Sequence, residues 1–171
     1  MRIVLIGIVV LVVAVTALAF YMGCFRRVTI SEETRGPFTL VYRDMAAGDM
    51  KKVGEITSAL DTLLSGAGVA KRKPLDVFLP DGTGEIGFAV EGVPAETLAR
   101  LGGEAKVKEI AAQRCMVAEF PWRNPMSFMV GYFKVDPALT GHRTAHGYRK
   151  VEALALNDGD RIIYMQPVVP L

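Results

Sequence analysis

Apolar and polar positions alternate along several short stretches of the chain, and this period-two pattern predicts β-strands. The clearest stretch is residues 38–43, in which Phe38, Leu40 and Tyr42 share one face. Elsewhere apolar residues recur every three or four positions, which predicts amphipathic helices. One such helix is expected between Asp49 and Gly66, and a second is expected after Pro125 and interrupted at residues 136–137. The pattern therefore predicts a domain that mixes strands and helices.

Two stretches about 75 residues apart have nearly the same pattern, residues 74–90 and residues 150–165. Each predicts a strand that carries one carboxylate, a polar turn that contains Asp-Gly, and a returning apolar strand. The carboxylates are Asp76 in the first hairpin and Glu152 in the second. The repetition predicts two similar half-domains with one acidic side chain at a matching position in each.

Each predicted hairpin follows a strand and a helix, so each half of the chain has the order β-α-β-β. The two repeats cover about residues 36–92 and 113–167. Two such units can place their strands in one antiparallel sheet with both helices on one face, which is an α+β architecture. The repeat length exceeds the roughly 20–50 residues of solenoid units, so we expect a duplication within one domain with a groove between its halves.

The N-terminal segment is different in character from the rest of the chain. Residues 3–21 contain no charged side chain, and roughly 20 apolar residues suffice for a membrane-spanning helix. This composition predicts a transmembrane anchor over residues 1–27 that contacts the membrane through residues 3–22, followed by one domain over residues 28–171. Acylation at Cys24 and a cleaved signal peptide are the alternatives.

Charges beside this segment bear on the expected topology. Arg2 precedes it, whereas Arg26 and Arg27 follow it. Cytoplasmic flanks are the more basic ones, so this small difference favours a single-pass membrane protein with its domain on the cytoplasmic side.

The remaining composition excludes several classes of function. The chain has 20 basic and 18 acidic residues and a formal net charge of +2, so nothing predicts the dense basic face of a nucleic-acid-binding protein. Cys115 lies in an apolar run and is expected in the core, while His142 and His146 are expected in a turn without nearby cysteines. We therefore expect no metal site, no cofactor and no nucleic-acid partner.

Particular motifs resemble a known family. Residues 36–42 followed by residues 48–54 resemble the opening of GyrI-like domains, the effector-binding small-molecule modules related to the SOUL haem-binding proteins. Residues 120–127 and 135–139 are similar to one branch of that family. This branch contains membrane-anchored proteins similar to the testis-expressed ER-phagy receptor of animals. The resemblance covers roughly residues 35–168.

The resemblance implies two pseudo-symmetric β-α-β-β halves with a ligand cleft between them. It also implies that Glu152 lies at the floor of this cleft, where family members often hold a glutamate that meets cationic drug-like ligands. Aromatic residues usually line the walls of such a cleft. The candidates here are Trp122, Tyr132, Tyr148 and Tyr164.

The residues around Glu152 support a binding role independently of the resemblance. Its neighbours Val151, Ala153 and Leu154 are apolar, and an unpaired carboxylate is costly to bury among them. Glu152 is therefore expected in a salt bridge, at an edge or beside a wet cavity. A carboxylate among aromatic rings would attract an amphipathic cation. For Asp76 only the symmetry argues for a binding role, and a strand-edge acid near Lys73 is the alternative.

These observations predict a membrane-tethered sensor or sequestering protein for a small hydrophobic ligand, with a cation favoured by the glutamate. One alternative is a hydrolase that uses the cleft glutamate against a reactive small molecule. Another is a membrane-anchored adaptor that binds a protein partner. No second acid or base lies at a suitable spacing from Glu152, so we expect binding rather than catalysis.

Overall fold

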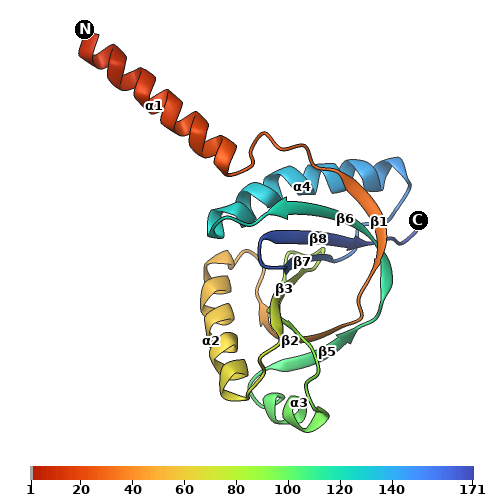
Figure 1. The fold of residues 1–171 in the computed structure, drawn as a ribbon. Helices are drawn as coiled ribbons and strands as arrows, with labels where there is room; N and C mark the ends of the chain where they lie inside the picture. The colour runs from red at the N-terminus through yellow and green to blue at the C-terminus, as the bar shows by residue number, and fades with distance from the viewer. Residues whose placement is uncertain (1) are drawn as a thin grey trace.

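The computed structural model describes residues 2–171 (Figure 1). Their helices are α1 (Arg2–Tyr21), α2 (Val53–Gly66), α3 (Ala95–Leu101) and α4 (Pro125–Ala145), with one turn of 3-10 helix at Met50–Lys52. Their strands are β1 (Ile30–Arg35), β2 (Phe38–Met45), β3 (Arg72–Phe78), β4 (Gly84–Val90), β5 (Lys106–Ile110), β6 (Gln113–Pro121), β7 (Ala153–Asn157) and β8 (Arg161–Pro167). The chain is thus α+β.

All eight strands form one antiparallel sheet in the order β1-β6-β8-β7-β3-β4-β2-β5. Each half follows the order strand, helix, strand, strand: β2-α2-β3-β4 in the first half and β6-α4-β7-β8 in the second. The halves meet at the centre of the sheet, where β3 pairs with β7 from Leu75↔Leu156 to Phe78↔Ala153. Any site on this central pair is therefore built by both halves.

The edges of the sheet are joined by a second contact between the halves. β1 pairs with β6 up to Arg35↔Gln113, and β2 pairs with β5 from Phe38↔Ile110 onward. Phe38 lies three residues after Arg35, and Ile110 lies three residues before Gln113. The two ladders therefore keep the same register across the bend that separates them. Gly36 at this bend has φ +96°, and a Cβ there would lie 3.2 Å from the carbonyl oxygen of Ala111. The shared register explains why the sheet curls (Figure 1).

Helices α2 and α4 cover the outer face of the curled sheet (Figure 1). Leu60 and Leu64 of α2 pack on β2 and β4, and Val135 and Leu139 of α4 pack on β6, β7 and β8. An apolar stripe on each helix is thereby removed from water, which is the main source of helix stability in a folded protein.

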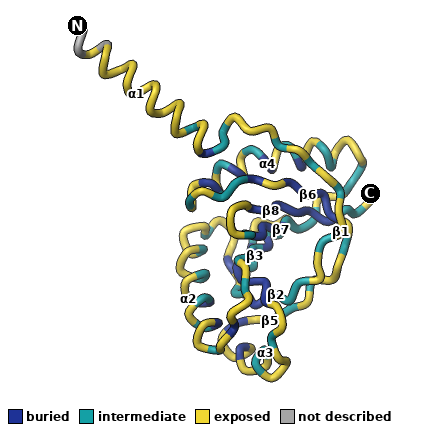
Figure 2. Tube along the Cα trace, in the orientation of Figure 1, coloured by how far each residue is buried: buried dark blue, intermediate teal, exposed yellow. Residues whose placement is uncertain are grey.

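The inner face of the curl carries a separate group of buried apolar residues, which we call the concave cluster. Its members are Leu40, Leu75, Val77, Ala89, Cys115, Val117, Leu154, Leu156, Ile163 and Met165. Figure 2 shows the central strands as the most deeply buried part of the molecule. Because both halves contribute to the cluster, the inner face is the place where a groove between the repeats would lie.

The predicted transmembrane anchor and the single-pass topology are wrong. α1 projects from the domain (Figure 1), but the described residues contain no helix that is both long and apolar enough to cross a membrane. Crossing takes roughly 20 apolar residues. α1 has 20 residues including Arg2, and the chain turns directly after Tyr21. The buried Met22 then contacts the domain, with its sulfur 3.4 Å from Asn124 Nδ2.

Two elements differ in extent from the sequence-based expectation. The strand expected at residues 150–154 begins only at Ala153, so Glu152 precedes β7. Helix α4 continues through Pro137 to Ala145 instead of breaking there. Proline removes one helical hydrogen bond, but the burial of Val135 and Leu139 on either side of Pro137 holds the helix against the sheet.

Candidate functional site

The concave cluster is the apolar surface of the sheet that neither α2 nor α4 covers, since the side chains of these helices belong to clusters on the other face. Phe38, Tyr42, Leu79 and Ile110 pack against its margins. Small-molecule sites are typically concave and mostly apolar, with a few polar groups at their borders. The inner face has this composition and draws residues from both repeats.

A hollow of about 310 Å³ adjoins the concave cluster. Ala89 and Leu156 of the cluster and the neighbouring Phe38 supply its apolar walls. The remaining lining residues are Pro37, Ala70, Lys71, Arg72, Lys73, Val90 and Glu91. Ligand pockets usually measure roughly 300–1,000 Å³, so this hollow suits a small molecule or one part of a larger one.

Most basic groups around the hollow already have acidic partners. Lys73 Nζ lies 2.7 Å from Asp158 Oδ1, and this hydrogen bond is the main cause that raises the pKa of Lys73. Arg72 Nε lies 2.8 Å from Asp61 Oδ1. Lys71 forms no ion pair within the part of the chain that the structure describes. The hollow is therefore only weakly positive.

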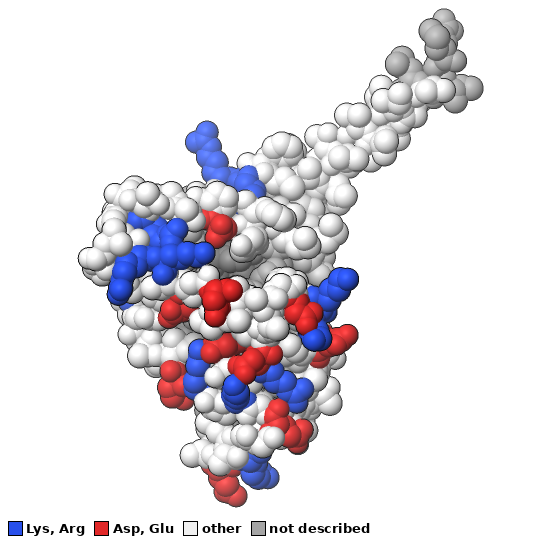
Figure 3. All heavy atoms as spheres, turned by 180° about the vertical axis from the view of Figure 1, so that it is seen from behind, with Lys and Arg blue, Asp and Glu red and all other residues white. Residues whose placement is uncertain are grey.

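Cross-strand ion pairs occupy other borders of the sheet as well. Lys108 pairs with Glu85, and its ammonium nitrogen lies 5.4 Å from the centre of the Tyr42 ring. Arg161 pairs with Glu119 at 3.1 Å. In the view of Figure 3, acidic and basic side chains intermingle over the lower half of the domain. Paired charges of this kind leave little net field to attract a ligand.

Two acidic residues in this region, Glu91 in the wall of the hollow and Glu152, form no ion pair among the described residues, and Glu152 is the more buried of the two. Glu152 is half-buried. Burial raises the pKa of the Cys115 thiol to about 11, and the charge of Glu152 adds to this increase. Cys115 belongs to the concave cluster, so the charge of Glu152 acts on a member of that cluster, as does the opposing and larger effect of Arg35.

Asp76 lies on the opposite face of the sheet. Its neighbours Leu75 and Val77 belong to the concave cluster, so the alternating strand directs Asp76 toward the helices. Burial raises the pKa of Asp76 to about 7, and the hydrogen bond that its Oδ1 accepts from Gly87 N at 3.3 Å opposes this shift. Lys73 is not its partner, because the Lys73 ammonium pairs with Asp158.

The four aromatic candidates lie on α4 or pack against the cluster beneath it. Tyr164 is buried under α4 and donates a hydrogen bond to the carbonyl oxygen of Phe128 at 3.0 Å. Trp122 and Tyr148 pack against the same cluster beneath α4. Tyr132 is 49 % exposed on α4 and contacts the edge of the Phe133 ring. None of these four residues belongs to the concave cluster.

The structure brings Phe38 and Tyr42 to the concave cluster instead. A sequence signal for them existed, since the alternation in residues 38–43 put Phe38, Leu40 and Tyr42 on one face. Alternation alone does not say which face the helices cover, because Val41 on the opposite face is also apolar and buried.

Comparison with known proteins gave matches at the level of the fold. No protein-family profile matches the chain, and no curated protein matches it. A structure of SAV2435 bound to tetraphenylphosphonium aligns with a TM-score of 0.60 at 18 % identity, over 82 % of this chain and 93 % of that one. The EcmrR C-terminal domain aligns with a TM-score of 0.64 at 8 % identity, over 84 % and 99 %.

A third solved structure, an integron cassette protein from the mobile metagenome of Vibrio cholerae, aligns with a TM-score of 0.50 at 10 % identity, over 84 % of this chain and 96 % of that one. At these identities the likeness concerns the fold alone. The fold is consistent with the GyrI-like small-molecule-binding domains that the sequence motifs resemble. Nothing in the comparisons supports the membrane-anchored branch of that family.

Proposed function

We propose that this protein binds a small apolar molecule on the concave face between its two repeats, and that Glu152 makes a cation the preferred ligand. The observation that carries the proposal is the concave cluster itself. It is apolar, it is built by both repeats, and it adjoins a hollow of about 310 Å³ instead of a covering helix. A hydrophobic ligand in this hollow would remove its apolar walls, Phe38 among them, from water.

The charge preference rests on the pairing of the surrounding groups. Lys73, Lys108 and Arg161 have acidic partners, whereas Glu152 has none among the described residues. A half-buried carboxylate without a counter-ion is unfavourable, and a cationic ligand would supply that counter-ion. Tetraphenylphosphonium, the ligand in the SAV2435 structure, is a cation of this kind and supports the ligand class.

Binding without covalent chemistry suits this site better than hydrolysis. The Cys115 thiol has its pKa raised to about 11, so it is protonated at neutral pH and is a poor nucleophile. The Tyr164 hydroxyl points to the other face of the sheet and donates to Phe128. Neither group offers Glu152 a partner for general acid–base catalysis. A sensing or sequestering role follows from this proposal.

A pair of ions with the same shape and opposite charges tests the proposal. Tetraphenylphosphonium and tetraphenylborate are titrated into the full chain by isothermal calorimetry. We expect the cation to bind more tightly, and Glu152→Gln to weaken the cation by about tenfold, which corresponds to about 1.4 kcal/mol. The same substitution should leave tetraphenylborate binding unchanged or stronger. Glu55→Gln, which alters an exposed carboxylate on α2, is the matched control and should change neither affinity.

A second variant locates the binding site. Ala89 lines the hollow, so Ala89→Leu fills part of it and should weaken both ions. Circular dichroism and thermal unfolding verify that the variant is folded. Undiminished binding in Ala89→Leu would place the site elsewhere. Tighter binding of tetraphenylborate than of tetraphenylphosphonium in the wild type would show that the basic wall, not Glu152, selects the charge.

A further inference from the structure

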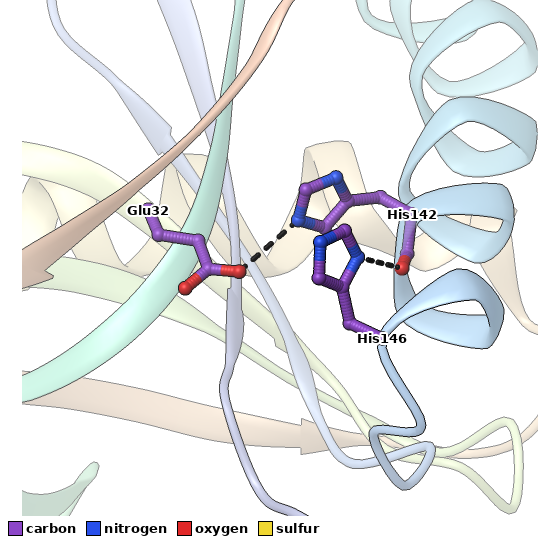
Figure 4. A group of neighbouring side chains, drawn as sticks. All are labelled: Glu32, His142 and His146. Atoms are coloured by element: carbon purple, nitrogen blue, oxygen red, sulfur yellow. Dashed lines mark hydrogen bonds and ion pairs between the residues drawn. The ribbon is translucent and has the colours of Figure 1, made fainter.

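Three side chains of types that can bind metals meet at the C-terminal end of α4, one from β1 and two from the end of the helix (Figure 4). Glu32 belongs to β1, His142 to the last turn of α4, and His146 is the C-cap of that helix. One ligand atom of each lies within 4.8 Å of the other two. The i, i+4 spacing of the histidines places both rings on one side of the helix.

The distance between two of the ligands fits a metal ion closely. His142 Nε2 lies 3.1 Å from Glu32 Oε1. Two ligands held about 2.0–2.1 Å from one tetrahedral ion are about 3.3 Å apart, so an ion would replace the shared proton with little movement. The side chains of Glu32 and His142 are 14 % and 23 % exposed, so the pair is shielded but open to solvent.

The His146 ring stacks on the His142 ring, with 4.1 Å between the centroids and 24° between the planes, so His146 must turn for both histidines to bind one ion. Its Nδ1 lies 2.8 Å from the carbonyl oxygen of His142, which accepts a hydrogen bond and therefore fixes the proton on Nδ1. The other ring nitrogen keeps its lone pair, and in Figure 4 it lies on the side of Glu32 and His142. A hydrogen bond to the distal ring nitrogen commonly orients a ligating imidazole and raises its basicity.

Glu32 is likewise held in place. Tyr148 donates its hydroxyl to Glu32 Oε1 at 3.1 Å, and an Arg114 guanidinium nitrogen lies 2.8 Å from Oε2. Arg114 is 68 % exposed, so water screens its repulsion of a cation. The negative end of the α4 dipole also favours positive charge here.

We propose that Glu32, His142 and His146 bind a divalent transition-metal ion. Two imidazoles and one carboxylate suit Zn²⁺, Co²⁺, Ni²⁺ or Fe²⁺ better than Mg²⁺ or Ca²⁺, which prefer oxygen ligands alone. Three protein ligands leave at least one coordination position open for water or another ligand. The ion would tie β1 to the end of α4, and it would do so on the helix-covered face, away from the concave cluster.

Calorimetric titration of the full chain with Zn²⁺ tests this site. We expect binding at one ion per chain, a higher melting temperature with the ion, and losses of affinity of more than about 100-fold in Glu32→Gln, His142→Ala and His146→Ala. Tyr148→Phe should weaken binding by roughly tenfold, because it removes a support of Glu32. Arg114→Gln should change the affinity little, because water screens the exposed Arg114 guanidinium. Glu33→Gln changes the adjacent carboxylate and is the matched control.

Cobalt spectroscopy separates this site from the two free cysteines, Cys24 and Cys115. The visible bands of bound Co²⁺ should lack thiolate charge transfer and disappear in His142→Ala. Because the chain contains two histidines, their NMR signals report the site in the unmodified protein, and both should shift with Zn²⁺. Unshifted histidine signals, binding that survives in the histidine variants, or binding that requires a cysteine would each overturn the proposal.

Discussion

At the scale of single residues, Asp76 is a carboxyl group on a face of the sheet where water is largely excluded. Its pKa of about 7 means that the folded protein keeps a proton that the unfolded chain releases above about pH 4. The stability that this proton contributes is therefore present at low pH and is lost as the pH rises toward 7. Asp76 should make the protein more stable in mild acid than at pH 8.

The variant Asp76→Asn tests this expectation, since asparagine retains the size and an acceptor oxygen but has no proton to release. Relative to wild type, its free energy of unfolding should rise by up to about 1.4 kcal/mol for each pH unit between pH 4 and 7, then level off. Urea denaturation at pH 4 to 8 measures the difference. Parallel pH profiles for the two proteins would show that Asp76 is ionised normally in the fold.

Glu152 and Asp76 show how far the site could be predicted from the sequence. The apolar neighbours of Glu152 predicted a carboxylate beside an apolar surface; in the structure Glu152 is half-buried, and its charge is one of the causes that raise the pKa of Cys115. Asp76 has the same kind of neighbours but lies on the face opposite to the concave cluster. Both strands are apolar on both faces, so alternation could not distinguish the two positions.

At the scale of elements, α4 lies so close to the sheet that one of its glycines has no room for a side chain. A Cβ on Gly131 would lie 2.5 Å from the Tyr164 hydroxyl oxygen and 3.1 Å from Phe120 Cδ1. A Cβ on Gly141, which lies later in the same helix, would meet nothing within 4 Å. The two glycines therefore form a matched pair for testing how α4 packs.

Gly131→Ala should destabilise the protein by about 1–3 kcal/mol, because α4 or Tyr164 must shift to admit the methyl group. Gly141→Ala should instead stabilise it by about 0.5–1 kcal/mol, because alanine favours the helix and meets no neighbour. Urea denaturation midpoints compare both variants with wild type. Equal effects from the two substitutions would contradict the packing of α4 on β6 and β8 through Gly131.

Local patterns predicted the elements well where one signal dominated. The helix expected after Pro125 is present as α4, which begins at Pro125, and the structure shows a capping box in which Asn124 and Ser127 satisfy each other's backbone groups. The continuation through Pro137 was not visible, because it depends on the contact of Val135 and Leu139 with the sheet. Because a helix interruption was predicted at residues 136–137, the sequence did not indicate that His142 and His146 lie one helical turn apart at the end of α4.

At the scale of the whole molecule, the curled sheet turns one apolar face outward to the helices and the other inward. The duplication of the β-α-β-β order was readable from the sequence, and the structure shows that the repeats meet twice, at β3–β7 and along the joined ladders of β1–β6 and β2–β5. The membrane anchor predicted from the composition of the N-terminal segment is wrong, because the described residues contain no helix that is long and apolar enough to cross a membrane.

The central claim is that a small apolar cation binds to the inner face of the curled sheet. Amide and methyl NMR shifts of the full chain, recorded during titration with tetraphenylphosphonium, test it most directly. The account predicts saturable shifts at Leu75, Ala89 and Leu156 of the concave cluster and at Glu152, with no change at Val135 and Leu139 beneath α4. Shifts confined to α1 or to the helix-covered face, or no saturable shifts at all, would contradict it.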